Sequence, residues 1–250
     1  MPRLGFSGHN VLPFETDWTM PAGHLSSYLH DVREARELYR GRVEIYLGIE
    51  ADFIPGLTSP AHERIRALGL DYVLGSVHFI GPNAGDHQWT VDGPRSELEE
   101  AIRLGFQGDA RKLVERYYQL LAEMARTAPP DIVSHFDVVK KNNSDGSLFS
   151  EEERWYREAV RMALGAVRSS GSVLEINTGA LVRSTNGTYY PSPWILQEAW
   201  ALDIPVMINA DAHDPAHIDA RFTEAAEILR DAGFRSQRQL TAEGWIDVNL

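Results

Sequence analysis

Six residues of the types that bind divalent metals stand at the ends of short apolar runs in this sequence. They are His9, Glu50, His78, His135, Asp211 and His213. Imidazole and carboxylate groups bind zinc, manganese and iron, and the chain has no cysteine that could add a thiolate ligand. The pattern favours a metal site that could activate water for a hydrolytic reaction.

The runs that lead to these residues have the character of β-strands. They cover residues 4–9, 45–50, 72–78, 132–135, 173–178 and 206–213, and only the fifth ends in other residues, Asn177 and Thr178. Most of the spacers between them carry helical periodicity, which is typical of parallel strands joined by crossover helices. Because the carboxyl ends of such strands meet at one face of a βα barrel, we expect the six side chains to converge there.

The spacers predict helices over residues 25–39, 59–68, 109–125, 150–167, 191–202 and 215–232. Ser59 followed by Pro60 is a helix-start signal. Ser150 and Glu153 fit a capping box. Residues 79–94 read as a long loop, and residues 245–250 as either a final short strand or an extended tail.

Each candidate ligand, taken alone, has an ordinary structural explanation. Asp211 could cap the following helix, Glu50 could be a solvated strand end, and His78 or His135 could be a core histidine. Their occurrence at the ends of different predicted strands favours metal binding by the group. Alternation along the last strand places the side chains of Asp211 and His213 on the same face.

Positively charged residues follow two of the predicted strands. Arg183 lies just beyond the fifth strand, where its guanidinium could bind phosphate in a bidentate manner or form a surface salt bridge. Lys140 and Lys141 could supply a second positive group or be exposed loop residues. Asp137, two residues after His135, could orient an imidazole.

The remaining histidines are weaker candidates. His87 could contact a substrate from the long loop, although a loop residue without such a role is the more ordinary reading. His24, His30 and His62 are expected to face solvent, and His217 to lie at the start of a helix.

Composition favours one globular domain over residues 1–250. The chain is 43% hydrophobic, and no linker-like segment divides it.

No apolar stretch approaches the roughly 20 residues that span a bilayer, and no leader pattern is present, so the expected location is the cytoplasm, with no membrane partner. The net charge of -12 argues against a nucleic-acid partner. A small anionic substrate is compatible with it, because metal ions can reverse the local field.

Seven segments in order carry a resemblance to a known family. They are GFSGH at 5–9, GIEADFIPG at 48–56, GSVHF at 75–79, SHFD at 134–137, EINTGA at 175–180, YPSPWIL at 190–196 and NADAH at 209–213. With these segments the chain resembles the polymerase and histidinol phosphatase (PHP) superfamily, and within it the histidinol-phosphate phosphatases. The resemblance implies an α/β fold, a distorted (β/α)7 barrel that holds two to three divalent metal ions of zinc, manganese or iron.

The resemblance also implies how the ligands are shared. Glu50, His78 and His135 would hold one metal ion, and Glu50 would bridge to a second ion that Asp211 also binds. His9 and His213 would help to hold a third.

The sequence departs from the family pattern at its amino end. The family begins with a strand that carries a His-x-His pair, and a further histidine follows it; none of these is found here. Six parallel strands are also too few for the usual closed barrel. The first of seven strands is therefore expected to be missing, and a start codon assigned too late or a truncated chain is favoured over a chain that functions without it. In the second case the metal ion at Glu50 and Asp211 would lose two ligands.

By resemblance, the chain is expected to hydrolyse L-histidinol phosphate to L-histidinol and phosphate in histidine biosynthesis. Arg183 and Lys140 would stabilise the phosphoryl group. Two alternatives remain open: action on another small phosphoester, and a non-catalytic protein that binds a metal or a phosphometabolite through an incomplete cluster. Metal content separates them, because the catalytic cluster needs at least two ions per chain. The sequence assigns no oligomeric state.

Overall fold

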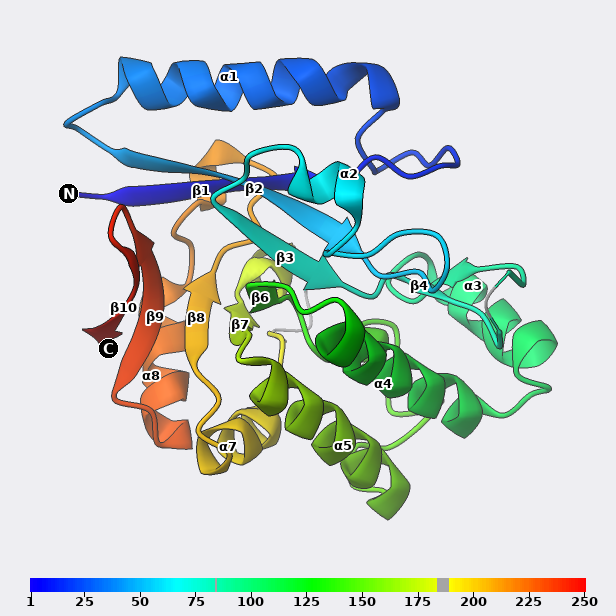
Figure 1. Ribbon diagram of the computed structural model, residues 1–250. Helices are drawn as coiled ribbons and strands as arrows, with labels where there is room; N and C mark the ends of the chain where they lie inside the picture. The colour runs from blue at the N-terminus through cyan, green and yellow to red at the C-terminus, as the bar shows by residue number, and fades with distance from the viewer. Residues whose placement is uncertain (84, 184–188) are drawn as a thin grey trace.

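The main sheet contains all six predicted strands. The computed structural model describes residues 1–83, 85–183 and 189–250. The strands are parallel and lie in the order β1-β2-β3-β6-β7-β8, forming a curved half-barrel (Figure 1). Their bounds are Arg3–His9 (β1), Glu44–Asp52 (β2), Tyr72–Ser76 (β3), Ile132–Val133 (β6), Val173–Asn177 (β7) and Val206–Asn209 (β8). Four of the predicted strands, which became β3, β6, β7 and β8, end earlier than expected. His78, His135, Asp211 and His213 therefore lie on the segments that follow β3, β6 and β8.

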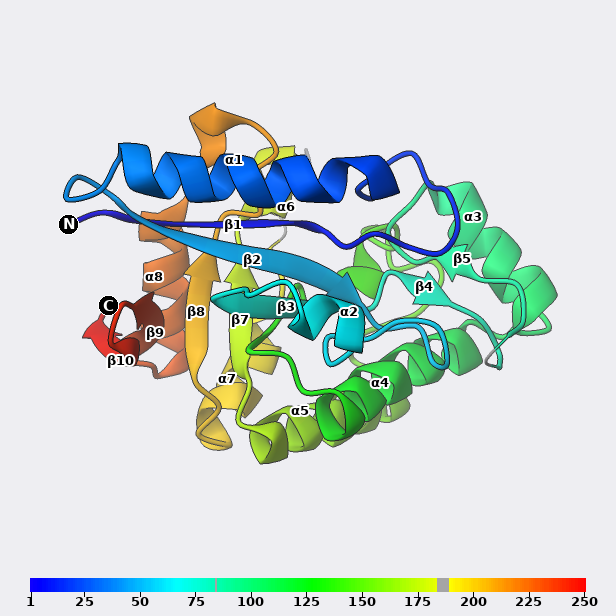
Figure 2. The same cartoon turned by 45° about the horizontal axis from the view of Figure 1, so that its top comes forward.

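The helices lie outside the sheet. Their bounds are Leu25–Leu38 (α1), Glu63–Arg66 (α2), Arg95–Glu100 (α3), Ala110–Thr127 (α4), Arg154–Ser170 (α5), Gly179–Arg183 (α6), Pro193–Ala201 (α7) and Phe222–Ala232 (α8). In both views α1 runs alongside β1 and β2, α4 and α5 lie side by side, and α8 lies next to β8 at the other edge of the sheet (Figures 1 and 2). Among the described residues, none of the helices combines the length and the apolar character that crossing a membrane requires.

Two short antiparallel pairs accompany the main sheet. β4 (Phe79–Ile80) pairs with β5 (Trp89–Thr90) inside the predicted long loop, and β9 (Ser236–Thr241) pairs with β10 (Gly244–Asn249). The second pair confirms the strand reading of the carboxyl-terminal residues, while β9 was not predicted.

The β9–β10 hairpin covers the amino-terminal end of the half-barrel. Its Leu240 and Trp245 pack against a cluster of apolar residues that includes Tyr72 and Ile132, the first residues of β3 and β6. Arg3 Nη1 donates to Gln239 Oε1 at 2.8 Å, which joins β1 to β9. The hairpin therefore closes the end of the half-barrel opposite to the predicted metal ligands.

Alternation along β2 explains why one strand serves both the core and the site. Ile45 and Leu47 pack against α1, whereas Tyr46 and Glu50 point into the interior cavity. A Cβ atom on the intervening Gly48 would lie 2.5 Å from the ring of Tyr72, so only glycine leaves room for that ring. Because both faces are buried, the strand reads as a nearly continuous apolar run with single polar positions.

The prediction of a helix over residues 59–68 was wrong about its start. α2 begins at Glu63, and His62 is its N-cap, whose side chain accepts a hydrogen bond from Arg64 N at 3.2 Å. Ser59 and Pro60 belong to the preceding turn, where Ser59 O accepts from His62 N. The helix-start signal used for the prediction was the pair Ser59 and Pro60. It did not take into account that a histidine side chain can accept a hydrogen bond from a free backbone N–H at the start of a helix.

The capping box predicted at Ser150 also does not form. Ser150 Oγ accepts from Glu152 N at 3.2 Å, and α5 begins only at Arg154. The helix predicted over 215–232 is likewise divided, because Arg221 has φ 66 and separates a 3-10 turn at Pro215–His217 from α8. In both cases a local turn took the place of the first helical residues.

Candidate metal centre

Three side chains from neighbouring strands meet at the carboxyl end of the half-barrel. Glu50 is on β2, and His78 and His135 follow β3 and β6. His135 Nε2 lies 3.0 Å from Glu50 Oε1, His78 Nε2 lies 3.5 Å from the same oxygen, and the two Nε2 atoms are 3.1 Å apart. All three side chains are buried. We refer to them as the central cluster.

The central cluster has the spacing of a metal site. Four ligands at about 2.0–2.1 Å in tetrahedral geometry are about 3.3 Å from one another. The three separations in the cluster lie close to that value, and the ligand atoms form a candidate metal-binding group. Two imidazole nitrogens that face each other beside a carboxylate suit a shared cation, and this donor set fits zinc, manganese or iron.

Electrostatics in the central cluster favour a bound positive charge. Burial opposes ionisation of Glu50, but the hydrogen bond from His135 and the nearby histidines hold the pKa of Glu50 well below its usual range. Burial disfavours the charged form of His78, yet Asp52 and more distant carboxylates raise its pKa to about 10. Burial also opposes protonation of His135, and Glu50 nevertheless raises its pKa. A cation can take the place of the protons that these groups share.

Two serines hold the carboxylate of Glu50 in position. Ser76 Oγ donates to Glu50 Oε1 at 2.5 Å, and Ser76 Oγ lies 2.5 Å from Ser134 Oγ. Ser134 Oγ in turn donates to Gly75 O at 3.0 Å. The serines come from β3 and the end of β6, so the strand pairing itself fixes the orientation of the carboxylate.

His9, the last residue of β1, stands at the edge of the central cluster. Its Nδ1 lies 3.7 Å from Glu50 Oε2, and its ring packs against Trp18 and His78 with centroid distances of 4.8 and 5.3 Å. Nδ1 is buried and, within the described chain, has no hydrogen-bond partner. Burial lowers the pKa of His9, so this ring offers a neutral nitrogen that a metal ion could use.

A second group of polar side chains gathers around Asp211. Asp211 Oδ1 lies 3.2 Å from His213 Nε2, and Asp211 Oδ2 lies 2.6 Å from Arg183 Nη2 and 3.2 Å from Asn177 Nδ2. Arg183 Nη1 also donates to Asp211 O. β8 ends at Asn209 and Asp211 has φ 47, so strand alternation was the wrong reason for placing Asp211 beside His213.

One cavity of 730 Å³ connects the two groups. Five of the six predicted ligands line it, namely His9, Glu50, His135, Asp211 and His213. Glu175 and Asn177 line it as well. His78, the sixth, does not line the cavity, but it contacts two residues that do, Glu50 and His135. The structure therefore brings all six to one place, with direct contacts inside each of the two groups.

Glu175 links the groups and was not singled out as a site residue. Its Oε2 accepts from His135 N at 2.7 Å and from Asn177 Nδ2 at 3.0 Å, and its Oε1 accepts from Asn209 Nδ2 at 2.9 Å. Burial raises the pKa of Glu175. The signal that could have identified it is a lone carboxylate in the otherwise apolar run of β7, since such a group must find partners when buried.

Lys140 and Asp137 form a buried ion pair. Lys140 Nζ lies 2.7 Å from Asp137 Oδ2 and also donates to Ser192 Oγ, and Ser192 N donates to Asp137 Oδ2 at 2.9 Å. Lys140 is 9% exposed. The expectation that Asp137 orients an imidazole was wrong, because His135 Nδ1 and Asp137 Oδ1 both lack a hydrogen-bond partner in the described part of the chain.

The weaker candidates lie at the surface or in turns. His87 is exposed and packs edge-on against Trp89 at 4.5 Å, and His24 and His30 are exposed as expected. Lys141 Nζ donates to Asp92 O at 2.6 Å.

Comparisons with known proteins agree with this geometry. The PHP domain family matches residues 1–179. A protein of Deinococcus radiodurans named "Probable histidinol-phosphatase" is 30% identical over 235 residues, which cover 93% of this chain and 83% of the relative. The histidinol-phosphatase of Bacillus subtilis is 26% identical over 208 residues, which cover 81% of this chain and 75% of that protein.

A solved structure has the same fold. The crystal structure of histidinol phosphate phosphatase from Lactococcus lactis, complexed with zinc, L-histidinol and phosphate, superimposes with a TM-score of 0.67 at 18% identity. The match covers 98% of this chain and 88% of that one. At this identity the likeness establishes the fold of the half-barrel that carries the site.

Proposed function

Because this chain belongs to the PHP domain family, we propose that it is a metal-dependent phosphomonoesterase, a single domain that hydrolyses L-histidinol phosphate to L-histidinol and phosphate. The relatives that carry the name histidinol-phosphatase support this substrate. The relative with zinc, L-histidinol and phosphate supports a small-molecule phosphoester as the ligand of the cavity.

One observation carries the proposal. Glu50 Oε1, His78 Nε2 and His135 Nε2 converge within 3.5 Å from three adjacent parallel strands, at the wall of a cavity large enough for a small molecule. A buried core histidine is satisfied by ordinary hydrogen bonds to one or two partners. Such hydrogen bonds do not require two histidine nitrogens and a carboxylate oxygen to lie so close to one another.

The proposed metal ligands belong to the two groups at the cavity. Glu50, His78, His135 and His9 would hold divalent ions at the central cluster, and Asp211 and His213 would hold a further ion across the cavity. Bound there, the ions supply Lewis acidity toward phosphate oxygens and lower the pKa of a water molecule.

The chain's own contribution is to orient these ligands. Ser76 fixes one oxygen of Glu50, and Glu175 fixes the backbone of His135. Asn177 Nδ2 donates to both Glu175 and Asp211, so it joins the two groups of proposed ligands. Ligands held in this way keep their geometry when a substrate enters.

Phosphate release from L-histidinol phosphate tests the proposal. The purified chain is stripped of metal, and zinc, manganese or iron(II) is added back, with an aliphatic phosphomonoester and a phosphodiester as comparison substrates. We expect hydrolysis of L-histidinol phosphate only with metal, and at least two ions per chain by elemental analysis. Hydrolysis of another phosphoester alone would replace the substrate, whereas bound metal without any hydrolysis would favour a binding protein.

Arg183 is the group that we propose to bind the phosphoryl oxygens. Its side chain is 39% exposed, and its guanidinium contacts Asp211, which lines the cavity. Replacing it by alanine removes charged hydrogen bonds worth about 1.5–3 kcal/mol, so kcat/KM is expected to fall roughly 10- to 100-fold. Steady-state kinetics measure this change.

The matched control for Arg183 is Arg161→Ala. Arg161 also pairs with a carboxylate, Glu198, and is 50% exposed, but it lies on α5 away from the cavity. Its loss should leave kcat/KM unchanged. An equal effect of the two variants, or none from Arg183→Ala, would remove Arg183 from the site.

A further inference from the structure

We propose that Asp52 is a positioning residue of the metal centre, whose carboxylate holds the His78 ring so that Nε2, rather than Nδ1, faces the central cluster. The inference rests on the proposed metal centre. It concerns a residue that the sequence pattern did not single out.

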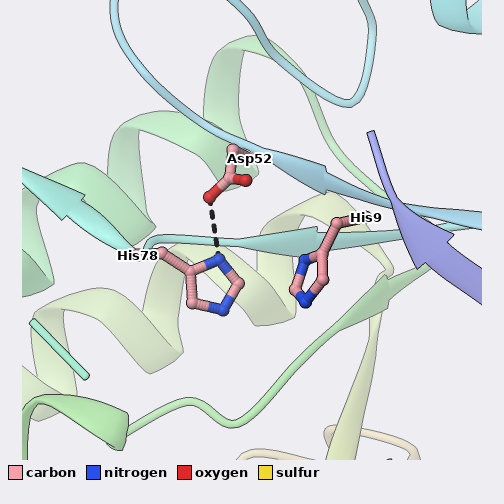
Figure 3. A group of neighbouring side chains, drawn as sticks. All are labelled: His9, Asp52 and His78. Carbon is pink, nitrogen blue, oxygen red and sulfur yellow. Dashed lines mark hydrogen bonds and ion pairs between the residues drawn. The ribbon is translucent and has the colours of Figure 1, made fainter. Parts of the chain in front are cut away.

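The geometry around Asp52 is that of a carboxylate that orients an imidazole. Asp52 Oδ1 lies 2.8 Å from His78 Nδ1 (Figure 3), and both side chains are buried, at 1% and 3% exposed. In a neutral imidazole one nitrogen carries the proton and the other carries a free lone pair. If Nδ1 carries the proton and donates it in a hydrogen bond to Asp52, the lone pair is on Nε2. His78 Nε2 is the atom that faces Glu50 and His135.

The position of Asp52 on its strand makes this arrangement possible. Asp52 follows Glu50 by two residues on β2, so both carboxylates point to the same face. Glu50 reaches the Nε2 side of the His78 ring, and Asp52 reaches the Nδ1 side. One strand therefore supplies both the carboxylate ligand and the group that orients its histidine neighbour.

Asp52 is itself held from a third element. Its backbone N–H donates to Asn10 Oδ1 at 3.0 Å, and Asn10 Nδ2 contacts Thr58 Oγ1 at 3.3 Å. Asn10 directly follows β1, and it is buried. A buried carboxylate is costly unless a partner compensates it, and here the Nδ1 atom of His78 is the hydrogen-bond partner of Asp52 Oδ1.

An alternative role for Asp52 is direct coordination together with His9 and His78. Ligand atoms of these three residues do lie within 4.8 Å of one another (Figure 3). However, two ligands of one tetrahedral ion are about 3.3 Å apart, and the 2.8 Å between Asp52 Oδ1 and His78 Nδ1 is a hydrogen-bond distance. By contrast, the 3.5 Å between His78 Nε2 and Glu50 Oε1 is close to the separation of two ligands of one ion. Nε2 is therefore the atom of His78 that fits metal binding.

The test compares Asp52→Ala and Asp52→Asn with Asp92→Asn in the full chain. Asp92 is the matched control, because its charge also acts on His78 but without a hydrogen bond to it. Zinc affinity is measured by competition with a chromophoric chelator. Nitrogen-15 NMR of the zinc-loaded protein, labelled at histidine, identifies which nitrogen of His78 bears the metal and which bears the proton.

We expect Asp52→Ala to lose about 10- to 100-fold in zinc affinity and to lose the single pattern of metal-bound Nε2 and protonated Nδ1 at His78. Asp52→Asn should lose less, because its amide oxygen can still accept from Nδ1. Asp92→Asn should keep both the affinity and the NMR pattern.

Other results would overturn the inference. It fails if Asp52→Ala keeps the affinity and the His78 pattern, or if Asp92→Asn loses as much affinity as Asp52→Ala. If Asp52→Ala does not fold, the same criteria apply to Asp52→Asn, whose lowered affinity with an unchanged Asp92→Asn would support it. Wild-type protein that binds no zinc at His78 would overturn the metal centre and this inference together, which separates that failure from the failure of Asp52 alone.

Discussion

Replacing Glu50 by glutamine is expected to abolish tight zinc binding and, with it, phosphatase activity. Glu50 is the one carboxylate of the central cluster, and His9, His78 and His135 all lie around it. Glutamine keeps the shape but removes the charge that offsets a cation. The loss in zinc affinity should exceed the roughly 10- to 100-fold cost of losing an orienting partner. Calorimetric titration of the metal-free protein measures it.

The control for this variant comes from the same strand. Glu44, at the start of β2, pairs with Arg3 at 2.9 Å on the surface, at the end of the strand that is far from the cluster. Glu44→Gln should keep both zinc affinity and activity. If Glu50→Gln bound zinc as tightly as the wild type, the central cluster could not be the metal site.

Lys140→Met is expected to destabilise the protein strongly. Burial raises the pKa of Asp137, and the ammonium of Lys140 opposes that effect, so its removal would leave an uncompensated buried carboxylate. Breaking one partner of such a pair costs about 3–5 kcal/mol in the free energy of unfolding. Urea denaturation of the metal-free protein measures the change.

Two comparisons separate this structural role from the predicted contact with phosphate. Lys141→Met changes the exposed neighbour and should shift stability by no more than about 0.5 kcal/mol. Adding Asp137→Leu to Lys140→Met should restore part of the lost stability, because no charge is then left unpaired. If instead Lys140→Met kept wild-type stability and lost kcat/KM for L-histidinol phosphate, the residue would belong to the phosphate site.

Much of the fold could be predicted from the sequence because its signals are local. The six strands of the main sheet are short apolar runs closed by polar residues, and α1 and α4 follow their helical periodicity closely. The ends of elements were less predictable. At α2 and α5 a side chain or a turn competed for the first free amides, and such competition depends on geometry that a pattern does not contain.

The convergence of the candidate ligands could also be predicted, since parallel strands bring their carboxyl ends together whatever the details of packing. That rule was sufficient to place His9, Glu50 and His135 in one cavity. It was not sufficient for residues whose partners lie far away in the chain. Asp137 was expected to orient the nearby His135, yet its carboxylate pairs with Lys140 and also accepts a hydrogen bond from Ser192 N, 55 residues away.

The sequence by itself determined where the strands of the main sheet lie along the chain, because a strand pattern depends on only a few neighbouring residues. It also showed that residues of metal-binding types stand at or just past the ends of these strands. Only the tertiary structure decided which carboxylate serves which histidine. Asp52 meets His78 across 26 residues, and Glu175 meets His135 across 40. These pairings depend on strand register and on the direction of each side chain, and small changes in either move a hydrogen bond out of reach.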